Sequence, residues 1–123
     1  MNISAIKREK LDLLLAMGRN SHPREFAALL SATSGVITDV SLIPGSIGGE
    51  ASAQIPFEMV PLNLGIIGSA HSHPNGAIWP SDADIRFFAV SGSCHIIVGY
   101  PYGEDDWRCF HPDGSPRPLE VVE

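Results

Sequence analysis

The first eighteen residues place apolar side chains at intervals close to those of an amphipathic helix. Ser4 precedes these apolar positions where an N-cap would stand, and Gly18 follows them as a C-terminal stop signal. The apolar positions are Ile6, Leu11, Leu13, Leu14 and Met17. They share one rough face at 3.6 residues per turn, so the pattern predicts a helix from just after Ser4 to about Gly18.

Short apolar runs bounded by turn residues follow, and such runs predict strands. We expect a buried strand over residues 26–30 and a second over 36–43, joined by a tight connection. Residues 53–57 predict a short strand, and Pro56 within it favours the edge of a sheet. Residues 64–73 predict a central strand, because the run is apolar first and then ends in two histidines.

The remaining segments complete an α+β pattern. A helix is expected to begin at the acidic run 80–84, an antiparallel hairpin to pair residues 95–100 with 107–110, and a last edge strand to span 119–122. This order of elements predicts a sheet with helices on its faces. The 123 residues, of which 44% are apolar, suit one domain spanning 1–123.

Charge and hydropathy narrow the possible partners. The net charge is −6 and the eight basic residues are scattered, which argues against nucleic acid as the main partner. Residues 1–10 lack the apolar centre of a signal peptide, and no apolar run approaches the roughly 20 residues of a membrane span. We therefore expect a soluble cytoplasmic protein without a membrane partner.

The two cysteines, Cys94 and Cys109, are too few and too far apart for a zinc finger. Reduced and partly buried thiols are the favoured interpretation. A disulfide between neighbouring strands is the alternative, and the sequence alone leaves it open.

Candidate chemistry gathers in the run His71-Ser72-His73-Pro74, which is followed at fixed spacing by Ser81 and Asp84. Alternate residues of a strand point the same way, so the two histidines can share a face. Residues three apart on a helix also share a face, so the serine and the aspartate can point together. Two imidazoles and a carboxylate are a ligand set of open catalytic zinc sites, so the pattern predicts one zinc ion per chain.

Simpler interpretations compete with this one. The histidines could be ordinary core or surface residues, and Ser81 could be no more than the N-cap of its helix. Other zinc signatures are absent: the chain has no H-E-x-x-H and no H-x-E with P-C-x-x-C.

The motif resembles that of the JAMM (MPN+) zinc metalloproteases, which is an upstream Glu, then H-[ST]-H-P, six residues, S, two residues and D. The likeness to the compact archaeal members extends over nearly the whole chain. It implies a curved mixed sheet flanked by two or three helices, in a layout similar to that of cytidine deaminases, with a single zinc site.

The resemblance also implies a role for each site residue. His71, His73 and Asp84 would bind zinc, Ser81 would donate a hydrogen bond to the oxyanion, and Glu25 would be the general base. Glu50 and Glu58 are rival carboxylates that also precede the motif. Trp79 could equally line a substrate groove or anchor its loop. The other histidines, His22, His95 and His111, have no motif partner, and we expect ordinary structural or surface roles for them.

The function implied by the resemblance is hydrolysis of a peptide or isopeptide bond at the C-terminal tail of a ubiquitin-like protein, as in deubiquitinases and desampylases. The tail would lie extended in a groove. Processing of a sulfur-carrier C-terminus, in cofactor or cysteine biosynthesis, is the alternative task for the same chemistry. A non-catalytic MPN scaffold is the alternative of another class. A monomer and a homodimer are both compatible with the sequence.

Overall fold

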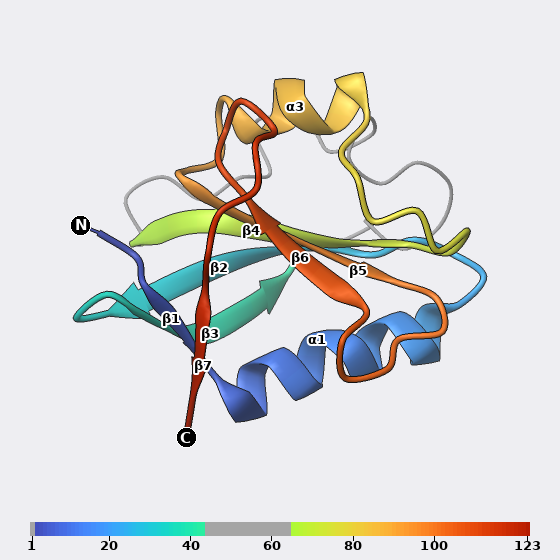
Figure 1. Cartoon of the computed structure of the whole chain (residues 1–123), viewed down its shortest axis with the longest axis horizontal. Coiled ribbons are helices and arrows are strands. Elements are labelled where there is room, and N and C mark those ends of the chain that lie inside the picture. The colour runs from blue at the N-terminus through green and yellow to red at the C-terminus, as the bar shows by residue number, and fades with distance from the viewer. Residues whose placement is uncertain (1, 44–64) are drawn as a thin grey trace.

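The computed structural model describes residues 2–43 and 65–123, and these form a curled mixed sheet with a helix on each face (Figure 1). The helices are α1 (Arg8–Ser21) and α3 (Asp82–Phe88). The strands are β1 (Ala5–Lys7), β2 (Ala27–Thr33), β3 (Val36–Leu42), β4 (Ile66–His73), β5 (Cys94–Gly99), β6 (Trp107–Phe110) and β7 (Glu120–Val122). They lie side by side in the order β6-β5-β4-β2-β3-β1-β7. The α+β class and the curved mixed sheet are confirmed.

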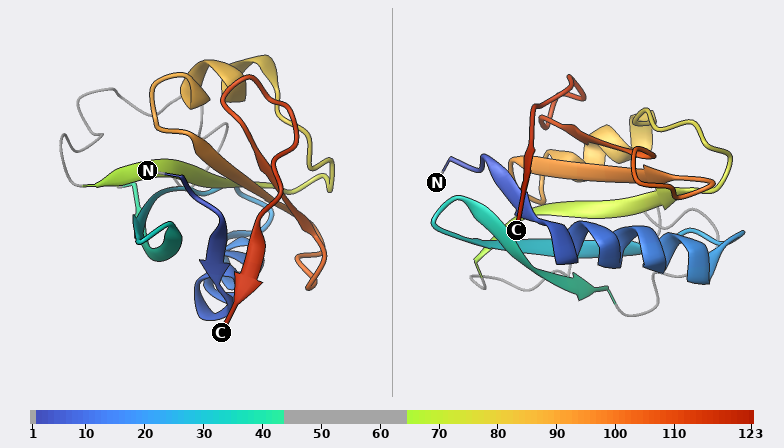
Figure 2. Two further views of the ribbon diagram at one scale, coloured as in Figure 1. Left: turned by 60° about the vertical axis from the view of Figure 1, so that its left-hand side comes forward. Right: turned by 60° about the horizontal axis from the view of Figure 1, so that its bottom comes forward.

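The strands at the centre of the sheet are buried on both faces, which explains their nearly continuous apolar sequences. In β2, Ala28 and Leu30 belong to the large core that includes α1, whereas Ala27 and Leu29 pack with Phe87 of α3. The two helices lie on opposite sides of the sheet in each view (Figure 2). The site can therefore form where β4 ends under α3.

Most strand predictions are confirmed with small shifts of their ends. The expected hairpin is the antiparallel pair of β5 and β6, and the expected last edge strand is β7. The strand predicted over 53–57 and the carboxylates Glu50 and Glu58 lie outside the described residues. In the described part of the chain, neither helix is long and apolar enough to cross a membrane.

The beginning of the first helix was predicted wrongly. Ser4 is not its N-cap: residues Ala5–Lys7 form β1, and the helix begins at Arg8 without a side-chain cap. Ile6 is fully buried and pairs with Ile37 of β3, so its apolar character serves the sheet. A three-residue strand joined directly to a helix has no periodicity of its own by which it could be recognised.

Gly18 was also wrongly assigned as a helix stop, because α1 continues to Ser21. The glycine instead makes room for the ring of Tyr102, which is 1% exposed. A Cβ atom added at Gly18 would lie 2.5 Å from Cδ1 of that ring. The constraint at this position is close packing between distant parts of the chain.

The two cysteines are buried free thiols, in agreement with the favoured interpretation. Cys94 lies on β5 and Cys109 on β6, and their Sγ atoms are 3.1 Å apart.

The packing at Gly18 gives a test with a definite sign. Gly18→Ala should destabilise the protein by about 1–3 kcal/mol through overpacking. Helix propensity alone would instead stabilise it by about 1 kcal/mol. The free energy of unfolding from denaturant titration distinguishes the two, with Asn20→Ala on the exposed side of α1 as the control. A Gly18→Ala protein as stable as the parent would contradict this account of the glycine.

Candidate metal centre

The end of strand β4 supplies two of the candidate ligands. His71 and His73 alternate with Ser72, so both imidazoles lie on the α3 side of the sheet. His71 is 1% exposed, whereas His73 is only partly buried. Because β4 lies between β2 and β5, pairing on both sides fixes its backbone: His71 is opposite Ala27 in β2 and Ile97 in β5.

The first turn of α3 supplies the third candidate ligand through a capping box. The Ser81 hydroxyl oxygen accepts a hydrogen bond from the Asp84 backbone N–H at 3.1 Å. The Asp84 carboxylate in turn accepts one from the Ser81 N–H at 2.8 Å, through Oδ2. These two bonds satisfy backbone donors that a helix start leaves unpaired. They also fix the carboxylate over the end of β4, so Ser81 is an N-cap as the simpler interpretation expected.

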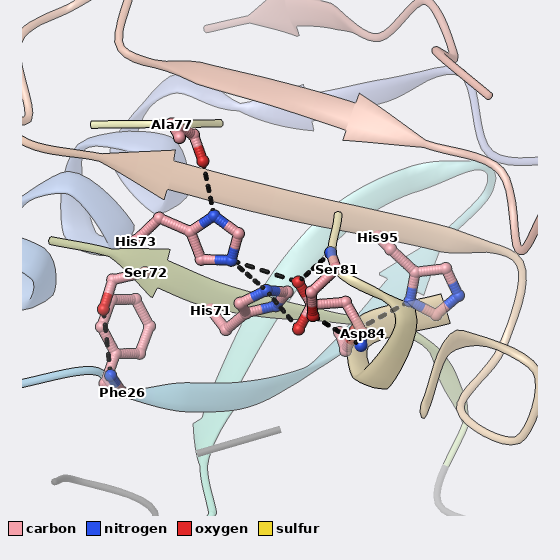
Figure 3. A network of polar contacts seen from close by, with 9 residues as sticks. Phe26, His71, Ser72, His73, Ala77, Ser81, Asp84 and His95 are labelled. Carbon is pink, nitrogen blue, oxygen red and sulfur yellow. Dashed lines mark hydrogen bonds and ion pairs between the residues drawn. The ribbon is translucent and has the colours of Figure 1, made fainter. Parts of the chain in front are cut away.

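Three potential donor atoms meet at this junction (Figure 3). The Nε2 atoms of His71 and His73 are 3.1 Å apart, and they lie 3.1 and 3.2 Å from Oδ1 and Oδ2 of Asp84, respectively. In a tetrahedral zinc site with bonds of about 2.0–2.1 Å, neighbouring ligand atoms are about 3.3–3.4 Å apart. The donor set and its dimensions therefore fit a zinc ion with one position left open.

The same contacts perturb the protonation of these groups. Burial by itself would raise the pKa of Asp84, but the hydrogen bonds with His71 and His73 outweigh it and hold that pKa well below its usual range. Burial would lower the pKa of His73, yet its hydrogen bond with Asp84 and its contact with the Ala77 carbonyl leave it raised. The carboxylate is thus ionised wherever it would have to bind a metal ion.

The backbone of the following loop orients His73. Its Nδ1 lies 2.6 Å from the Ala77 carbonyl oxygen. A carbonyl oxygen can only accept a hydrogen bond, so Nδ1 carries the proton. Nε2 is then left to face the potential metal-binding atoms of His71 and Asp84. This contact was not predicted: the Asn75-Gly76 pair signals the turn that precedes Ala77, but nothing in the sequence identifies the acceptor.

Glu25 lies in the same cleft as two of the candidate ligands, His73 and Asp84. It lies between α1 and β2. Because β2 runs antiparallel to β4 with Ala27 opposite His71, the residues just before β2 lie beside the C-terminal end of β4. The cleft has a volume of about 570 Å³, and the lining residues are Glu25, His73, Pro74, Asn75, Ser81, Asp82, Ala83 and Asp84. The fold therefore brings Glu25 to residues that lie far along the chain. The one nearest to it in sequence, His73, is forty-eight positions away, by the difference of the residue numbers.

The other residues singled out in the sequence have different positions. The Trp79 ring lies beside the Phe110 ring, with 6.0 Å between their centroids. The Arg108 guanidinium lies 5.0 Å from the centroid of the Trp79 ring. It is 55% exposed and is not among the described residues that line the cleft. These contacts favour the interpretation that Trp79 anchors its loop to β6.

His95 is a core residue, as expected for a histidine without a motif partner. It is fully buried and stacked on Phe88, with ring centroids 4.2 Å apart. Its Nε2 donates to the Gly92 carbonyl, which leaves Nδ1 to accept from the Ser69 hydroxyl at 2.7 Å. Burial lowers the pKa of His95 to about 4, so the ring is neutral at physiological pH. Two other histidines, His22 and His111, are exposed.

Comparison with known proteins agrees with this geometry. A family model described as prokaryotic homologues of the JAB domain matches residues 7–110. This chain belongs to the JAMM family. It is also similar to a protein from Haloferax volcanii named a probable metalloprotease, which is 39% identical over 131 residues, covering 98% of this chain and 81% of the relative.

Two solved JAMM structures are similar over almost their whole length. A JAB1/MPN domain protein from Archaeoglobus fulgidus is 36% identical with a TM-score of 0.77, covering 97% of this chain and 99% of the other. A structure reported as a metalloprotease-like zinc site in the proteasome and signalosome is 32% identical with a TM-score of 0.76, covering 99% and 100%. The JAMM resemblance of the sequence is thus confirmed, and with it the fold.

Proposed function

We propose that this JAMM protein is a zinc-dependent hydrolase that cleaves a peptide or isopeptide bond at the C-terminal tail of a ubiquitin-like protein. The observation that supports it most is the set of three donor atoms at the edge of a cleft that also contains Glu25 and Ser81. The family and the name of the Haloferax relative support the metalloprotease class. The ubiquitin-like substrate rests on the resemblance of the motif.

One zinc ion would be held by His71, His73 and Asp84. When bound, it supplies a water of lowered pKa and an electrophile for the scissile carbonyl. Asp84 brings negative charge to the ion, and the Ala77 carbonyl holds His73 in the tautomer with Nε2 free to bind. Together these residues define a site open toward the cleft.

Glu25 would act as the general base. It lines the cleft together with His73, and its negative charge contributes to the raised pKa of that histidine. A carboxylate placed there can take a proton from the attacking water and return it to the leaving amine.

Ser81 would donate a hydrogen bond to the oxyanion while it caps α3. These two roles are compatible, because the cap uses a lone pair of the hydroxyl oxygen as acceptor. The hydroxyl proton is a separate donor that can point toward the cleft. A donor at such a position typically stabilises the transition state by roughly 3–4 kcal/mol.

The open shape of the cleft suits an extended chain rather than a small enclosed ligand. A Lys-linked conjugate and a linear C-terminal extension of the same ubiquitin-like protein would separate the two tasks that share this chemistry. Preference for the linear extension would support processing of a carrier C-terminus. Zinc binding without cleavage of either would support a scaffold.

The zinc ligands can be tested by metal content. The purified protein should contain one zinc per chain, and the double variant His71→Ala, His73→Ala should contain none while keeping its circular dichroism spectrum. The fold should survive because the sheet has its own apolar core. The double variant His22→Ala, His111→Ala removes two exposed imidazoles and should retain the metal. Full zinc occupancy without His71 and His73 would refute the ligand assignment.

The general base can be tested with Glu25→Gln, which keeps size and hydrogen bonding but cannot take a proton. Zinc content and substrate affinity should be normal, and kcat should fall by roughly 10²–10⁴-fold. The same change at Glu50 or Glu58 should have much less effect. Near-normal turnover by Glu25→Gln would mean that another carboxylate is the base.

The oxyanion role of Ser81 can be separated from its capping role by two substitutions. Ser81→Ala removes both and should lower stability by about 1 kcal/mol, whereas Ser81→Gly should cost only a few tenths. Both variants lack the hydroxyl donor, so kcat should fall by about 10²–10³-fold in each while KM and zinc content change little. If kcat follows stability instead, so that the glycine variant is fully active, Ser81 is only a cap.

A further inference from the structure

Ser72, the residue between the two histidines, makes an unusual contact with the neighbouring strand. It is fully buried, and its backbone N–H donates to the Phe26 carbonyl at 3.2 Å. In a regular antiparallel pair, the return bond from Phe26 would go to the carbonyl of the same partner. Here the Phe26 N–H donates to the Ser72 hydroxyl oxygen at 3.0 Å (Figure 3). The acceptor of this hydrogen bond at the end of the β2–β4 pairing is thus a side chain.

This hydrogen bond lies directly beside Glu25. The N–H of Phe26 belongs to the peptide group that joins Glu25 to Phe26, so the Ser72 hydroxyl fixes the orientation of that peptide. The Phe26 side chain is itself fully buried in the large core. The backbone on the C-terminal side of Glu25 is therefore held at two points by the strand that carries His71 and His73.

Tyr102 also contacts this segment. It is 1% exposed, and its hydroxyl lies 3.4 Å from Nδ1 of His22, three residues before Glu25. Burial and the charge of Glu25 raise the pKa of Tyr102, and a hydrogen bond with Ser72 partly offsets the rise. Tyr102 thus contacts the chain just before Glu25 through His22.

We propose that Ser72 is a positioning residue for Glu25: its hydroxyl holds the Glu25–Phe26 peptide against β4 and so sets the carboxylate at a fixed place relative to the two histidines. The proposal rests on the proposed function of Glu25. A base must lie within hydrogen-bond reach of its proton, and a displacement of about 1 Å can cost roughly 10²-fold in rate. A hydroxyl between the histidines is therefore a requirement of the reaction as well as of the sheet.

The experiment compares Ser72→Ala, Ser72→Thr and Ser69→Ala, each in the zinc-loaded full chain. Ser69 is the matched control, since it is equally buried on β4 but its hydroxyl contacts His95. Zinc content, kcat, KM and the amide exchange rate of Phe26 by NMR are measured for each. Exchange reports the Phe26 bond directly and does not depend on activity.

Ser72→Ala should keep one zinc, lower kcat by roughly 10–100-fold with little change in KM, and speed Phe26 exchange by about tenfold or more. Ser72→Thr retains a hydroxyl and should restore both properties. Ser69→Ala should leave kcat and Phe26 exchange close to those of the parent. If Ser72→Ala does not fold, Ser72→Cys replaces it, with the same expected direction because a thiol is a weak acceptor.

A double-mutant cycle separates positioning from general destabilisation. In a Glu25→Gln background, Ser72→Ala should lower the residual rate by less than about threefold, because the residue acts through the carboxylate. A further loss as large as in the parent would overturn the proposal, as would normal kcat in Ser72→Ala itself. Full activity of Glu25→Gln alone would instead refute the proposed function.

Discussion

The buried carboxylate of Asp84 is the interaction on which the site depends. It is 1% exposed, and a charge removed from water in this way is tolerated only with close polar partners. Among the described residues, its partners include the imidazoles of His71 and His73 at the end of β4 and the Ser81 N–H at the start of α3. The end of β4, the loop that follows it and the start of α3 must therefore all be in their native positions for this carboxylate to be satisfied. The contact that satisfies the helix start also aims the carboxylate at the candidate metal position.

The pairing of β4 with both neighbours makes this junction rigid. On one side, β4 pairs antiparallel with β2, and Ala27 is opposite His71. On the other side it pairs parallel with β5, and Ile97 is opposite His71. A slip of one residue would turn both histidines to the opposite face. The core therefore fixes which face of β4 meets α3. It also determines where the segment between α1 and β2 passes, and so where Glu25 lies.

The sequence was most informative where the signal was local. The spacing of the motif predicted the group formed by His71, His73 and Asp84, and short apolar runs bounded by turn residues predicted the central strands. What it could not predict depends on distant contacts. Gly18 resembles a helix stop, although its small size is required by a ring eighty-four positions later, by the difference of the residue numbers. The hydroxyl of Ser72 has no pattern of its own, because its partner is the backbone of a segment brought there by the fold.

The candidate metal ligands lie close together in the sequence, whereas the Glu25 carboxylate of the same cleft comes from a separate segment. His71, His73 and Asp84 belong to one strand–loop–helix unit, and Glu25 reaches the cleft from before β2. On the proposed mechanism, a change at Glu25 removes turnover without disturbing the residues that hold the metal. Evolution thus has a one-step route from an enzyme to a metal-loaded binding protein. In such a descendant the histidine motif would persist intact, so its presence in a sequence reports retention of the ion more directly than retention of catalysis.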